Sequence, residues 1–84
     1  MRIVRLDQLP LRQVATISAI DWDALRPAEA RRLRELGLDE GVWVETLHVG
    51  PFGRDPIACR VGRMTIALRR AHASAISVCQ ADAA

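Results

Sequence analysis

The chain has 84 residues, with twelve basic and ten acidic side chains and a formal net charge of +2. This length supports one domain whose core can fold alone, and so small a net charge is no argument for a phosphate-binding surface. No apolar run approaches the ~18 residues of a membrane span, and Met1–Arg5 is not the start of a secretory signal. Cys59 and Cys79 lie in no metal or redox motif. We therefore expect a single cytoplasmic domain, residues 1–84, with free thiols.

The N-terminal part of the chain has a weak strand-like alternation of side chains, followed by a clear one. Arg2–Leu11 alternates only loosely around Pro10, so we expect it to lie across the outside of the fold. Gln13–Ile20 alternates with apolar side chains on both faces. That pattern is typical of a strand buried between the core and a covering element.

Arg26–Gly41 contains the best helix signal in the chain. Pro27 suits the first helical position, and Gly37 suits the residue just past the last turn. Between them, three apolar residues recur at helical spacing and form one narrow stripe: Ala30, Leu33 and Leu36. We expect a short helix that packs with this side on the rest of the domain, with Trp22 close enough to contact it.

The rest of the chain reads as short strands joined by turns. Gly62-Arg63 is the best hairpin signal, and the prolines and glycines of residues 50–56 predict a loop. The expected elements are strands at Val42–Val49, Ile57–Val61, Thr65–Leu68 and Ile76–Val78, a helical turn at Arg70–Ala75 and a frayed tail at 80–84. Five short strands with few helices favour a small closed β-barrel, because closure removes exposed sheet edges.

Several segments together resemble the FeoA family of small ferrous iron transport proteins. The resemblance rests on Arg32-Leu33-Arg34-Glu35-Leu36-Gly37-Leu38, Gly41, Asp55-Pro56-Ile57, and Ile66-Ala67-Leu68-Arg69 followed by Ala73 and Ile76. In order and spacing it runs from about Leu6 to Val78. It implies a mainly β fold, an SH3-like β-barrel of about five strands covered by one or two short helices. The chain departs from the family pattern at turn and surface positions: Leu11, Glu40, Arg54, Gly62 and His72.

The resemblance also implies a function. It implies a non-catalytic accessory protein of a ferrous iron transport system, whose partner is a FeoB-type membrane permease with a cytoplasmic G-protein domain. The same domain is fused to iron-dependent repressors, so the alternative is a free-standing regulatory domain of that kind. In either case the chain would reach a membrane only through its partner.

The residues themselves give little support to catalysis or to a bound cofactor. No catalytic motif surrounds His48, His72 or any serine, and the loop 50–56 lacks the lysine and helix of a phosphate-binding loop. The association with iron leaves transition-metal binding open. However, His48, Cys59, His72 and Cys79 have no ligand spacing, so we assign no metal ligands and expect no cofactor.

A protein-binding surface is the function class that remains. The helix arginines are interleaved with acidic residues and only three aromatics are present, which disfavours nucleic acid. Phe52 has little core within reach because it lies at a loop tip between Pro51 and Gly53. Arg54 lies on the same loop, and Trp43 is expected on the outer face of its strand. We predict that Phe52, Arg54 and Trp43 contact the partner.

Overall fold

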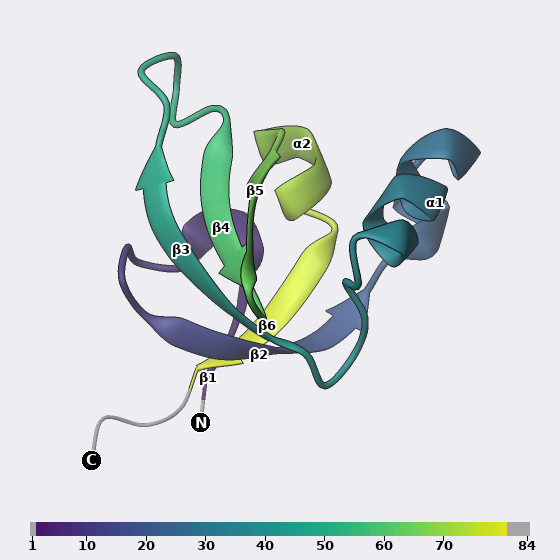
Figure 1. Cartoon of the computed structure of the whole chain (residues 1–84), viewed down its shortest axis with the longest axis horizontal. Coiled ribbons are helices and arrows are strands. Elements are labelled where there is room, and N and C mark those ends of the chain that lie inside the picture. Colours follow the sequence, from purple (N-terminus) through teal and green to yellow (C-terminus); the bar gives the residue numbers. More distant parts are fainter. Residues whose placement is uncertain (1, 81–84) are drawn as a thin grey trace.

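The computed structural model describes residues 2–80 and has one antiparallel sheet with short helices around it (Figure 1). The elements in chain order are β1 (Arg2–Arg5), η1 (Leu6–Gln8), β2 (Val14–Ile20), η2 (Trp22–Ala24), α1 (Pro27–Glu35), β3 (Trp43–Val49), β4 (Ile57–Val61), β5 (Met64–Leu68), α2 (Arg70–Ala73) and β6 (Ile76–Gln80). Here η marks a 3-10 helix. The strands lie in the order β1-β6-β2-β3-β4-β5. The mainly β fold is confirmed, and predicted strand boundaries shift by at most two residues.

Both ends of the chain differ from the prediction. Residues 2–5 are a strand, β1, which pairs antiparallel with β6 and places Ile3 opposite Cys79. This strand could not be predicted from its apolar pattern, because only Val4 is even half-buried and buried residues do not alternate with exposed ones. Gln80, predicted to fray, is the last residue of β6 and pairs with Arg2 and Ala15. The rest of the predicted tail, 81–84, lies outside the described residues.

The predicted closed barrel is wrong in one respect: the sheet is curved but open. It ends at β1 on one side and at β5 on the other, and these strands do not pair within residues 2–80. Closure is not needed to cover the core, because η1 and α2 pack against each other and supply buried residues. Leu6 of η1 and Ala73 of α2 are both fully buried. The fold is therefore only loosely barrel-like.

β2 is covered on one face only, which corrects the prediction that it is buried on both. Ala15 and Ile17 are buried, whereas Thr16 is exposed and Val14 is 52% exposed. A register shift between Ile17 and Ala19 then returns Ile20 to the core. The face of β2 that carries Val14 and Thr16 is therefore open to solvent.

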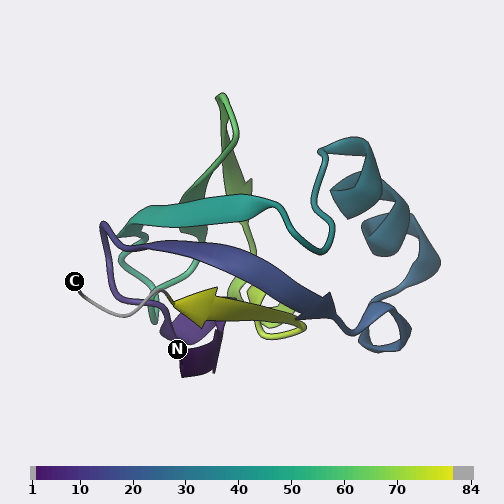
Figure 2. The same ribbon diagram turned by 90° about the horizontal axis from the view of Figure 1, so that it is seen from below.

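The predicted helix α1 is confirmed together with both of its end signals. Pro27 is its first residue, and Gly37 has a φ of +91°. The N–H of Gly37 donates to the Arg34 carbonyl and the N–H of Leu38 to the Leu33 carbonyl, both at 3.0 Å, which is the Schellman arrangement. Leu33 and Leu38 are each 1% exposed and belong to the same core. Figure 2 shows α1 beside the sheet, reached from β2 and returning to β3.

Candidate partner-binding surface

The loop 50–56 between β3 and β4 has a defined shape. The N–H of Gly50 donates to the Pro56 carbonyl at 2.7 Å, so the two ends of the loop meet. Gly50 has no room for a side chain, because a Cβ there would overlap the Asp55 carbonyl. At the tip, Gly53 and Arg54 both have a φ of 64°. Since a side chain is unfavourable at positive φ, Arg54 is held there by the rest of the loop.

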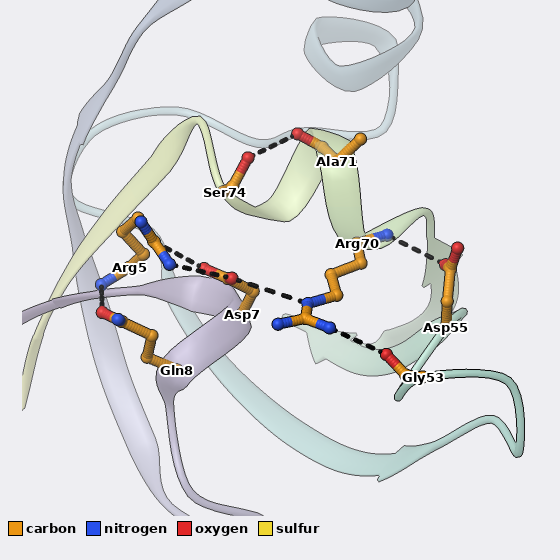
Figure 3. Close-up of polar contacts among 8 residues, drawn as sticks. All are labelled: Arg5, Asp7, Gln8, Gly53, Asp55, Arg70, Ala71 and Ser74. Atoms are coloured by element: carbon orange, nitrogen blue, oxygen red, sulfur yellow. Dashed lines mark hydrogen bonds and ion pairs between the residues drawn. The ribbon is translucent and has the colours of Figure 1, made fainter.

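Polar contacts from α2 brace this loop (Figure 3). The Asp55 carboxylate accepts the backbone N–H of Arg70 at 2.9 Å and pairs with Nε of Arg69 at 3.3 Å. Nη1 of Arg70 donates to the Gly53 carbonyl at 3.0 Å. The loop is therefore fixed at Gly53 and at Asp55, on either side of Arg54.

The bracing continues through Asp7, whose side chain is only 3% exposed. Its carboxylate accepts Nε of Arg5 at 3.0 Å and Nη2 of Arg5 at 3.3 Å, and it lies 3.9 Å from Nε of Arg70. A polar chain thus runs from β1 through η1 and α2 to the loop tip (Figure 3). The sequence prediction missed it, because Asp7 and Arg70 are far apart in sequence and no local pattern pairs them.

Phe52 and Arg54 occupy the exposed tip of the braced loop. Phe52 is 83% exposed, the highest value among the large apolar side chains described. Arg54 is exposed and forms no ion pair within residues 2–80. The same braced loop thus presents an aromatic ring and a guanidinium group that forms no ion pair within the described residues. This is the pairing that protein interfaces favour, because aromatic and arginine side chains are enriched there.

Trp43 lies elsewhere on the molecule. It is the first residue of β3, whereas the loop follows Val49 at the other end of the strand. At 3.4 Å per residue this separates the two sites by about 20 Å. Trp43 is 44% exposed on the outer face, in a cross-strand row with Thr16, Cys79 and Ile3. Of the three predicted contact residues, the fold brings together only Phe52 and Arg54.

The four soft metal-ligand candidates do not gather either. Cys59 is fully buried, and burial raises the pKa of its thiol to about 11, an effect that the neighbouring Thr46 hydroxyl partly offsets. His48 is exposed on β3, and Cys79 is half-buried on β6. Nε2 of His72 on α2 lies 3.1 Å from Oε2 of Glu29 on α1. Within residues 2–80, no three His, Cys, Asp or Glu side chains are placed to hold one metal ion.

A depression of about 390 Å³ lies between the end of β2 and α2. Asp21, Ser74 and Arg5 are among its lining residues. The Ser74 hydroxyl donates to the Ala71 carbonyl at 2.7 Å, so its hydrogen bond goes to a peptide group and not to a base (Figure 3). No lining side chain is a histidine or cysteine.

Comparison with known proteins assigns the chain to a family. A model of the FeoA domain matches residues 4–79. The chain belongs to the FeoA domain family. The family is associated with ferrous iron transport, as the sequence resemblance implied. No curated protein matches the sequence. No helix within residues 2–80 has the length and apolar character needed to cross a membrane.

Solved structures agree with this assignment. The FeoA protein of Chlorobium tepidum is 31% identical with a TM-score of 0.80, over 92% of this chain and 70% of that one. FeoA of Stenotrophomonas maltophilia in complex with zinc is 36% identical with a TM-score of 0.76, over 89% and 88% of the two chains. It is described as a prokaryotic SH3 domain protein. IdeR of T. acidophilum is 23% identical with a TM-score of 0.80, over 96% of this chain but 35% of that one, and shows the fold alone.

Proposed function

We propose that this chain is a cytoplasmic, non-catalytic accessory protein of ferrous iron transport that binds the G-protein domain of a FeoB-type permease. Membership of the FeoA family supports the transport role. The FeoA protein of S. maltophilia, a similar chain, is described as a candidate activating factor of ferrous iron transport. The observation that carries the binding role is Phe52, a phenylalanine 83% exposed on a loop that polar contacts hold in shape.

The loop tip can bind with a small entropy loss. Because the contacts at Gly53 and Asp55 already fix the backbone, little conformational freedom is lost when a partner covers it. Phe52 supplies apolar area that gains free energy only when it is covered. Arg54 supplies a guanidinium for a bidentate bond to a carboxylate of the partner.

Trp43 remains part of the proposal as a second contact. A standard interface buries ~800 Å² on each partner and is about 30 Å across. A single protein domain can therefore cover the loop tip and reach Trp43, about 20 Å away along the outer side of β3. On this basis we expect Trp43 to add less to the affinity than Phe52, which is nearly twice as exposed.

The alternative is a regulatory domain that acts in a repressor-like assembly on DNA. The similarity to IdeR supports only a shared fold, since the identity is 23%. The two functions differ in salt dependence, because nucleic-acid binding weakens steeply as salt rises and an apolar protein contact does not. Capture of the partner from solution at low and at high salt separates them.

Titration calorimetry with a purified FeoB G-protein domain tests the proposal. We expect Phe52→Ala and Arg54→Ala each to weaken binding by at least ~1 kcal/mol, with unchanged folding. Alanine at position 54 keeps the Cβ that arginine already carries at positive φ, so the substitution adds no strain. Arg31→Ala on the exposed side of α1 is the control and should have no effect. Absence of binding by the wild type would reject this partner.

A further inference from the structure

β5 is an open edge of the sheet with an ordered set of unused backbone groups. The loop between β4 and β5 has two residues, and the positive φ of 59° at Gly62 is typical of a type II′ turn. Such a hairpin makes Val61 and Met64 a hydrogen-bonded pair, and the pairs then alternate along the strands. The N–H and C=O groups of Thr65 and Ala67 therefore point away from β4.

Within residues 2–80, no hydrogen bond is formed with these outward N–H and C=O groups. β5 is the last strand in the sheet order, and no turn or loop forms a backbone hydrogen bond with Thr65 or Ala67. Both residues are exposed, and Met64 at the start of the strand is 43% exposed. β4 pairs with β3 from Ile57 to Val61, and in Figure 2 the turn between β4 and β5 projects beyond β3. An open edge of this kind can pair with an added strand.

Charge is unevenly distributed around this edge. Residues 50–72 contain five arginines and one aspartate, whereas residues 2–49 contain seven arginines and eight acidic residues. The arginines near β5 are Arg54, Arg60, Arg63, Arg69 and Arg70. Arg63, at the hairpin tip, forms no ion pair within residues 2–80, and Arg60 lies 3.9 Å from its partner Glu45. Arg63 and Arg69 flank the strand on either side.

The positive charges of Arg63 and Arg69 determine which added strands can pair with β5. Two copies of this chain pairing antiparallel about Ile66 would bring Arg63 of each copy beside Arg69 of the other. Like charges placed in this way oppose self-association, a common protection of sheet edges. An extended segment with acidic residues at both ends would instead place a carboxylate beside each arginine.

We propose that β5 binds an extended, acidic-ended segment of a partner protein as an added antiparallel strand. Thr65 and Ala67 supply the backbone bonds, and Arg63 binds one acidic end. Arg69 pairs with Asp55 through Nε, but its side chain is 71% exposed, so its other guanidinium N–H groups can bind the second acidic end. The inference does not depend on which protein carries the segment. If a peptide fails to bind while Phe52→Ala still weakens binding of the FeoB domain, only strand addition is rejected.

The test uses isotope-labelled protein and a short synthetic peptide of alternating valine and threonine with two aspartates at each end. We expect the amides of Thr65 and Ala67 to exchange with solvent more slowly when the peptide is added. Those of Ile66 and Leu68 should change little, because they already bond to β4. A peptide with lysines in place of the aspartates should not bind. Protection at β1 alone, or none at saturating aspartate peptide, would overturn the proposal.

Two variants separate strand addition from general charge attraction. Arg63→Glu should weaken peptide binding about tenfold or more, and Arg31→Glu, an equal charge change on α1, should leave it unchanged. Ala67→Pro removes one free N–H at the open side and should abolish binding while the chain stays folded by its melting curve. Equal losses in both glutamate variants would overturn the proposal, as would binding to anionic lipid vesicles without binding to the peptide.

Discussion

The helix α1 and the loop 50–56 are held to the sheet by different kinds of interaction. α1 is attached mainly by buried apolar side chains, with Leu33 and Leu38 each 1% exposed at its end, and by one polar contact from Glu29 to His72. The loop is attached by hydrogen bonds and ion pairs to Arg69 and Arg70, and its one large apolar side chain, Phe52, faces solvent. The helix uses its apolar surface for folding, whereas the loop leaves its apolar surface available for a partner.

The largest expected effect is on the helix side of this comparison. Leu33→Ala should lower the free energy of unfolding by roughly 2–5 kcal/mol, because it removes a buried side chain and leaves a cavity. That is a large share of the stability of a small domain. Urea denaturation followed by circular dichroism measures it.

Phe52→Ala is the matched control for Leu33→Ala. It removes a larger side chain, but one that is 83% exposed, and should shift the unfolding midpoint very little. If the two variants lost similar stability, the division of roles between helix and loop would be wrong.

The two regions also differ in how far the sequence predicts them. The helix follows from local signals: Pro27, Gly37 and an apolar stripe at helical spacing. The exposure of Phe52 follows from its place at a loop tip. The brace beneath the loop does not, because it joins Asp7 to Arg70 across the fold. Likewise β1 has a buried pattern too weak to detect, and the open edge at β5 depends on the complete strand order.

A moderate effect is expected at the brace. Asp7→Asn removes the charge from a carboxylate that is 3% exposed and contacts Arg5 and Arg70. Because charge-assisted hydrogen bonds are the stronger kind, we expect a loss of about 1–3 kcal/mol in unfolding free energy. Asp21→Asn is the control, since Asp21 is exposed and forms no ion pair within the described chain. No difference between the two variants would show that the brace contributes nothing.

A smaller effect, of opposite sign, is expected in the core of the sheet. The Thr46 hydroxyl is buried beside Cys59 and has no hydrogen-bond partner of normal geometry within residues 2–80. Thr46→Val replaces it with a methyl group and should raise the unfolding free energy by about 1 kcal/mol. The exposed Thr16→Val should change it much less. A destabilised Thr46→Val would mean that the hydroxyl makes a bond that matters for folding.

The smallest expected effect is that of metal removal. Treatment with a chelator should leave the melting temperature unchanged, because Cys59 keeps its proton in the core and the two histidines lie apart on β3 and α2. A melting temperature that falls on chelation and recovers with added zinc or iron would contradict this expectation.

Binding of the partner by the loop 50–56 can be tested by mapping the backbone amides that the partner protects along the chain. Amide exchange of the labelled protein would be compared with and without the FeoB G-protein domain. We expect slower exchange in residues 50–56, with exchange in α1 unchanged by the partner. Protection concentrated in α1, with residues 50–56 unaffected, would show that the helix and not the loop is the binding surface.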